Sequence, residues 1–123
     1  MRSILIIEDD PTIQKALSEV MLSEGYKVYT SFEADGGLEK VANNKPDLIL
    51  LDLILPGKSG FEFLKEIKNS PSTSSIPVVI LSNLGDEDEV RQGLKLGAVD
   101  FLVKADYDLN EVVKIIKKYF PKK

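Results

Sequence analysis

Residues 46–60 read Pro46-Asp47-Leu48-Ile49-Leu50-Leu51-Asp52-Leu53-Ile54-Leu55-Pro56-Gly57-Lys58-Ser59-Gly60. Four consecutive apolar residues, Leu48–Leu51, stand between two aspartates, and a Pro-Gly turn signal follows them. An uninterrupted apolar run of this length is typical of a parallel strand that helices cover on both faces. Packing gives no reason for a carboxylate directly after such a run, so Asp52 is the first candidate functional residue.

Other segments of the chain have the same character. Ile4–Ile7, Val78–Leu81 and Phe101–Val103 are short apolar runs, whereas Lys27–Ser31 is more polar and is typical of an edge strand. The segments between these runs repeat apolar residues with a helical period. This period predicts helices around residues 13–21, 34–42, 61–67, 90–94 and 109–120.

Five strands that alternate with five helices predict an α/β fold of the (βα)5 type. Such a chain folds as a parallel sheet with right-handed crossovers and with helices on both faces, which makes a three-layer sandwich.

Asp10, followed by Pro11, is expected to cap the first helix rather than to bind metal. The acidic run 86–89 is expected to form the first turn of the fourth helix. Asp47 is read as a strand-entry residue and Asp100 as a surface residue.

The composition excludes several classes of site. The 123 residues suffice for one domain, and we expect residues 1–123 to form it. The absence of Cys and His excludes disulfide scaffolds, thiolate and histidine metal sites, and Ser-His-Asp triads. The net charge is −4 and no basic stripe is present, so no nucleic-acid partner is expected. No apolar run is long enough to insert into a membrane, and Met1–Ile4 leads straight into a strand, so we expect a cytoplasmic protein without a signal peptide.

Chemistry is expected beyond the carboxyl ends of the strands, where open α/β sheets bind ligands. The first strand leads into Glu8 and Asp9, the third into Asp52, the fourth into Ser82, and the fifth into Lys104. If the first and third strands are neighbours, their carboxylates converge, and a hard divalent cation such as Mg²⁺ would relieve the repulsion between them. Carboxylate, metal, ammonium and hydroxyl together form a set that could receive a phosphoryl group.

The chain resembles the response-regulator receiver domains of two-component signalling, in their single-domain chemotaxis-like form. The resemblance covers essentially the whole chain and rests on four blocks in order, residues 4–11, 46–60, 77–82 and 97–104. It implies a flavodoxin-like sheet with the strand order 2-1-3-4-5. It also implies a phosphoprotein that assists its own phosphorylation and dephosphorylation but is not an enzyme in the usual sense.

The resemblance carries roles to individual residues. Asp52 matches the phosphoacceptor, Lys104 the lysine that pairs with the phosphoryl group, and Ser82 the switch hydroxyl. Phe101 matches the aromatic residue whose rotamer follows phosphorylation. The ligands that it implies for Mg²⁺ are Glu8, Asp9, Asp52 and the backbone carbonyl of Ile54.

One position departs from what the family usually has, and two others bear on the rate of hydrolysis. Ala105 stands where the family has a proline joined by a cis bond, and a cis bond before a non-proline residue costs about 2.5–4 kcal/mol. A trans bond is therefore expected, although it would put the reach of Lys104 in doubt. Ile54 and Leu84 lie at positions that influence hydrolysis in the family, and neither can orient a water molecule, so slow self-dephosphorylation is expected.

The leading hypothesis is a switch that a sensor histidine kinase or a phosphotransfer protein phosphorylates on Asp52. Its output would be onward relay, or binding of an unknown protein at the face of the fourth helix, fifth strand and fifth helix. One alternative is a pseudo-receiver, an interaction module that is never phosphorylated. Another is a flavodoxin-like redox enzyme, but the acidic residues 8–10 would repel the phosphate of its cofactor. Whether an effector domain accompanies this segment is left open.

Overall fold

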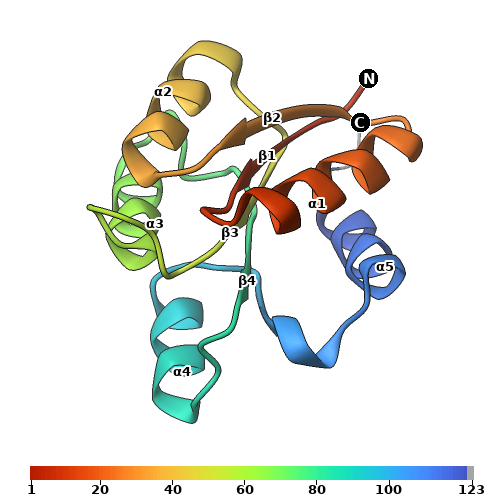
Figure 1. The fold of residues 1–123 in the computed structure, drawn as a ribbon. Coiled ribbons are helices and arrows are strands. Elements are labelled where there is room, and N and C mark those ends of the chain that lie inside the picture. Colours follow the sequence, from red (N-terminus) through yellow and green to blue (C-terminus); the bar gives the residue numbers. More distant parts are fainter. Residues whose placement is uncertain (122–123) are drawn as a thin grey trace.

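The computed structural model describes residues 1–121, in which five strands alternate with five α-helices (Figure 1). The alternation is the one that the apolar runs predict. The elements are β1 (Ser3–Ile7), α1 (Pro11–Ser23), β2 (Lys27–Ser31), α2 (Ala34–Asn44), β3 (Leu48–Leu51), α3 (Gly60–Asn69), β4 (Val78–Ser82), α4 (Glu87–Lys95), β5 (Asp100–Val103), the short 3₁₀ helix η1 (Lys104–Asp106) and α5 (Leu109–Tyr119).

All five strands form one parallel sheet in the order β2-β1-β3-β4-β5, which confirms the flavodoxin-like order. The polar strand β2 lies at an edge, as expected. Ile7 is the register partner of Leu51, so β1 and β3 end side by side. The residues that follow these two strands therefore emerge next to each other.

Helices cover both faces of the sheet and give it three layers. Figure 1 shows α1 and α5 on one side of the sheet and α2, α3 and α4 on the other. Successive side chains of β1 point to opposite faces: Leu5 and Ile7 pack on the side of α2 and α3, whereas Ile4 and Ile6 pack on the side of α1 and α5. This double burial is why the strands are apolar without alternation.

Aspartates cap the first and fourth helices, as expected for Asp10. Asp10 accepts hydrogen bonds from the backbone N–H groups of Thr12 and Ile13. Asp86, expected within the first turn of α4, instead caps it by accepting a hydrogen bond from Glu89 N at 2.8 Å, and residues 87–89 form the acidic first turn. These bonds satisfy N–H groups that have no partner inside the helix.

Two aspartates flank the sheet at its amino end. Asp47 accepts a hydrogen bond from Ser3 N at 2.8 Å, which agrees with a strand-entry role. Asp100 differs from the expectation of a surface residue, because it begins β5 and is half-buried. Its carboxylate accepts the Tyr119 hydroxyl at 2.8 Å and thereby fastens the end of α5 to the sheet.

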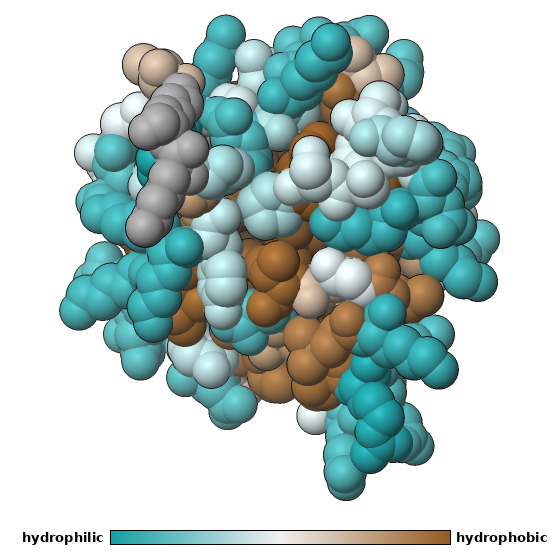
Figure 2. Space-filling view, turned by 180° about the vertical axis from the view of Figure 1, so that it is seen from behind, coloured by the Kyte–Doolittle hydropathy of each residue, from teal (hydrophilic) through white to brown (hydrophobic). Residues whose placement is uncertain are grey.

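Seen from behind relative to Figure 1, the surface is mostly polar, but apolar residues gather in the lower half of this face (Figure 2). Leu94 of α4 and Val99, in the connection from α4 to β5, are among the exposed apolar residues, at 45% and 39%. Within residues 1–121, no helix has both the length and the apolar character that crossing a bilayer requires.

Candidate functional site

Three carboxylates converge at the carboxyl end of the sheet. Glu8 and Asp9 directly follow β1, and Asp52 directly follows β3. One carboxylate oxygen from each lies within 4.8 Å of the other two. Glu8 and Asp52 are only 2% and 5% exposed, whereas Asp9 is open to solvent. The adjacency of β1 and β3 thus assembles the acidic pocket, defined here as Glu8, Asp9 and Asp52.

Lys104 reaches this pocket from the end of β5. Its Nζ lies 3.1 Å from Asp52 Oδ2 and 2.5 Å from Glu8 Oε1. The peptide bond between Lys104 and Ala105 is trans, as expected, like every other peptide bond in the described residues. The doubt about the reach of Lys104 is therefore removed: the side chain spans the distance with a trans bond.

The pocket perturbs the protonation of its members. Burial raises the pKa of Glu8 to about 7, and the nearby charge of Asp52 acts in the same direction. Burial by itself would lower the pKa of Lys104, but the hydrogen bond to Glu8 and the charges of Asp52 and Glu8 raise it overall. Negative charge is thus concentrated in the pocket, and Lys104 compensates it.

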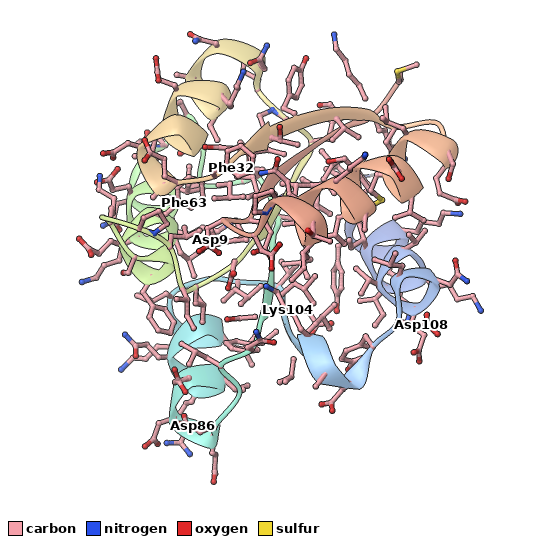
Figure 3. The ribbon with its side chains drawn as sticks, viewed as in Figure 1. Asp9, Phe32, Phe63, Asp86, Lys104 and Asp108 are labelled. Atoms are coloured by element: carbon pink, nitrogen blue, oxygen red, sulfur yellow. The ribbon has the colours of Figure 1, made fainter. Side chains whose placement is uncertain are left out.

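This donor set fits a hard divalent cation. Mg²⁺ prefers a few carboxylates together with water and phosphate oxygens, and the exposed Asp9 leaves one side of the pocket open to solvent. Figure 3 places Asp9 and Lys104 in the central region of the molecule, while Asp86 and Asp108, which cap α4 and α5, lie away from it. The cap aspartates therefore belong to the helices and not to the site.

The remaining candidate residues surround the pocket in different ways. Ser82 ends β4 and is fully buried, and its Oγ accepts a hydrogen bond from Leu84 N at 3.3 Å. Ile54 N donates to Asp52 Oδ1 at 3.2 Å, while the Ile54 side chain is 51% exposed. Phe101 is 9% exposed and packs in the core on the α4 side of the sheet. In this structure Phe101 is therefore turned inward.

Sequence reasoning missed Gln14, the one polar residue among the three that α1 buries. Its Nε2 donates to the backbone oxygens of Glu8 and Ser31, at 3.1 and 2.8 Å. The signal was present, because Gln14, Leu17 and Met21 share one helical face with the spacing i, i+3, i+7. A glutamine within an apolar stripe indicates a buried hydrogen-bonding role.

Sequence reasoning also missed Lys58, which fastens the loop after Asp52. Its Nζ lies 3.2 Å from Asp35 Oδ1 on α2 and 2.6 Å from Glu66 Oε1 on α3. The residue that follows, Ser59, caps α3 in a reciprocal pair of hydrogen bonds with Glu62. The loop between β3 and α3 is thus held at its far end.

Known proteins share this sequence and architecture. Residues 4–117 match the family described as "Response regulator receiver domain". The chain is 38% identical over 104 residues to transcriptional regulatory protein AfsQ1 of Streptomyces coelicolor, covering 85% of this chain but 45% of that protein. It is 35% identical over 120 residues to sporulation initiation phosphotransferase F of Bacillus subtilis, covering 98% and 94%. Among solved structures, the Mn(2+)-bound form of response regulator Rcp1 superposes with a TM-score of 0.86 at 28% identity, covering 99% and 100%.

Coverage of the relatives differs. The chain spans about half the length of the transcriptional regulators that it matches, whereas it spans nearly all of the Bacillus subtilis phosphotransferase. The match of residues 4–117, the five-stranded parallel sheet and the acidic pocket at its carboxyl end agree with one another. The chain belongs to the response regulator receiver domain family, a family of phosphoacceptor signalling modules.

Proposed function

We propose that the chain, as one domain spanning residues 1–123, is a phosphorylatable switch whose acceptor is Asp52. The observation that carries this proposal is the ammonium of Lys104, 3.1 Å from Asp52 Oδ2 and set against two further carboxylates. The Lys104 cation therefore already lies beside the Asp52 carboxylate to which a phosphoryl group would be transferred. Charges placed in this way before the reaction supply most of the catalysis of phosphoryl transfer in proteins.

The transfer forms one bond and breaks one. A carboxylate oxygen of Asp52 attacks phosphorus, and the P–N bond of a donor phosphohistidine breaks as the new P–O bond forms. The imidazole of the donor leaves with the electron pair of that bond. Lys104 then exchanges its contact with Asp52 for the oxygens of the phosphoryl group, and the Ser82 hydroxyl donates to another of them. The donor is a sensor histidine kinase or a phosphotransfer protein, in the cytoplasm.

Mg²⁺ is the proposed cofactor. Its ligands would be Glu8, Asp9, Asp52 and the backbone carbonyl of Ile54. The ion would supply positive charge to the oxygens of the transferred phosphoryl group. The clustering of three carboxylate oxygens within 4.8 Å supports this assignment, as does the Mn(2+)-bound form of the similar protein Rcp1.

Output is proposed to use the face of α4, β5 and α5. Closure of Ser82 on the phosphoryl group shifts the population of Phe101 rotamers, and this residue lies under α4. Leu94 on α4 and Val99 in the connection from α4 to β5 are exposed and give a partner protein apolar side chains to bind. The bound protein, or a further relay protein, receives the signal, and nucleic acid and membrane are not direct partners.

Phosphorylation by a small donor tests the proposal. The chain is incubated with acetyl phosphate, with Mg²⁺ or with EDTA, and its intact mass is measured. We expect one phosphoryl adduct that requires Mg²⁺, is lost in Asp52→Asn, and remains in the matched control Asp47→Asn at the opposite end of β3. Failure of the wild-type chain to form the adduct with any donor would favour the alternative, a pseudo-receiver that acts only by binding.

A further inference from the structure

Gln14 sits at a junction of three elements that border the acidic pocket. It is the fourth residue of α1, is 7% exposed, and faces the ends of β1 and β2. Burying an amide without hydrogen bonds is costly, so its partners show what the side chain is for. Both partners are backbone oxygens of residues at strand ends, Glu8 and Ser31.

These bonds extend the β1–β2 ladder by one step. Glu8 N donates to Ser31 O at 3.1 Å, and Gln14 Nε2 donates to that same oxygen at 2.8 Å. The second donor of the Gln14 amide goes to Glu8 O at 3.1 Å. The peptide groups on both sides of Glu8 are thereby fixed, directly or through Ser31.

The residues after Glu8 are fixed as well. Asp10 N donates to Glu8 Oε2 at 3.1 Å, and Asp10 Oδ1 accepts from Thr12 N at 2.9 Å. The turn of Glu8, Asp9 and Asp10 is therefore held by Gln14 on one side and by the helix cap on the other. The orientation of Asp9 depends on this turn, because its own side chain is exposed.

We infer that Gln14 is a positioning residue for the proposed cation site, which holds the β1–α1 turn so that Glu8 and Asp9 face a divalent cation before it binds. The inference rests on the proposed function and deepens it. Groups that orient metal ligands affect metal affinity by about 10–100-fold when they are changed. Gln14 acts on the backbone of one ligand rather than on its carboxylate, so the lower end of that range is expected.

Gln14→Met tests the inference, because methionine has a similar length and keeps the packing but donates no hydrogen bond. We expect the Mg²⁺ dissociation constant of the folded chain, measured by calorimetry, to rise about tenfold. The Mg²⁺ concentration for half-maximal phosphorylation by acetyl phosphate should rise by the same factor. The rate at saturating Mg²⁺ should largely recover, since the ion then imposes the geometry that the amide supplied.

A stability-matched control separates positioning from packing. Ile116→Val, on the buried face of α5, removes one methylene from the core and lowers stability, but Ile116 takes no part in the hydrogen bonds of the turn. It should leave Mg²⁺ affinity at the wild-type value. If Gln14→Met fails to fold, Gln14→Asn, which keeps the amide but shortens its reach, takes its place with the same expected shift.

The outcomes distinguish the two proposals. Wild-type affinity for Mg²⁺ in the folded Gln14 variant overturns the inference and leaves the proposed function standing. An equal loss in Ile116→Val overturns it too, since the effect would then follow stability alone. A wild-type chain that neither binds Mg²⁺ nor accepts a phosphoryl group overturns the proposed function and the inference together.

Discussion

The ammonium of Lys104 lies 3.1 Å from Oδ2 of Asp52, although 52 residues separate the two along the chain. Asp52 follows β3 and Lys104 follows β5, with β4 between these strands, so the lysine side chain extends across the end of β4. It does so from a trans peptide bond. Before any ligand arrives, the proposed acceptor already has its counter-cation in place.

Lys104→Met should lower the stability of the metal-free chain. Glu8 and Asp52 would lose the cation between them, and breaking a buried pair from one side costs about 3 kcal/mol or more. Urea unfolding in EDTA measures the loss. Lys117→Met is the matched control, because Lys117 pairs with Glu24 at the surface and is 49% exposed, so its loss should change stability far less. Equal losses in the two variants would contradict the interpretation.

Mg²⁺ should stabilise Lys104→Met more than it stabilises the wild-type chain. In the wild-type pocket an incoming cation competes with the Lys104 ammonium for Glu8 and Asp52, whereas in the variant it meets two uncompensated carboxylates. The melting temperature with and without Mg²⁺ measures the difference. A smaller Mg²⁺ shift in the variant would show that Lys104 helps rather than opposes cation binding.

The stability of the metal-free chain should carry a pH dependence that Glu8 causes. Burial raises the pKa of Glu8 from 4.5 to about 7, so in this window the folded chain retains a proton that the unfolded chain has released. Its contribution to stability therefore falls as the pH rises from 4.5 to about 7. In Glu8→Gln this contribution disappears, and the difference in unfolding free energy between variant and wild type should grow over the same window. Parallel pH profiles would contradict the prediction.

Gly60→Ala should destabilise the chain by about 2 kcal/mol, because an added Cβ meets backbone that cannot yield easily. It would lie 2.5 Å from the carbonyl oxygen of Asp52 and 2.6 Å from Leu53 Cα. Gly37→Ala is the control, since its Cβ meets the end of the Ile7 side chain at 2.5 Å, which can shift. In denaturant unfolding, Gly60→Ala should have a lower free energy of unfolding than Gly37→Ala, and the reverse order would contradict the prediction.

Ile54→Asn should accelerate release of phosphate from the phosphorylated chain. The Ile54 side chain is 51% exposed beside the pocket and cannot orient a water molecule, whereas an amide can. We expect about a tenfold faster release, below the usual contribution of a positioned acid or base. Leu94→Asn on α4 introduces the same amide at a similar exposure of 45% and should leave the rate unchanged. Unchanged or slower release in Ile54→Asn would refute the prediction.

Contacts between near neighbours in the sequence could be predicted, whereas contacts between distant residues could not. Asp10 is predicted as a helix cap and is one, because a cap bonds to residues two or three positions away. Asp86 is predicted within the first turn of the fourth helix and lies one position earlier, as its cap. The sequence predicts Asp100 as a surface residue, but it is half-buried because it binds Tyr119, 19 residues further along the chain. For Gln14, the helical spacing indicates burial, but its acceptor Ser31 lies 17 residues away, so the spacing does not reveal what it binds.

The sequence by itself determined the five strands, the five α-helices, their buried faces and the identity of the acidic residues after β1 and β3, but not the 3₁₀ helix η1. Local periodicity is enough for this, because an apolar run covered on both faces differs in pattern from an amphipathic helix. The tertiary structure alone decided that Lys104 reaches Asp52 through a trans bond and that Gln14 joins the ends of β1 and β2. These contacts depend on strand register and on side-chain reach across neighbouring elements, and residue spacing along a chain records neither.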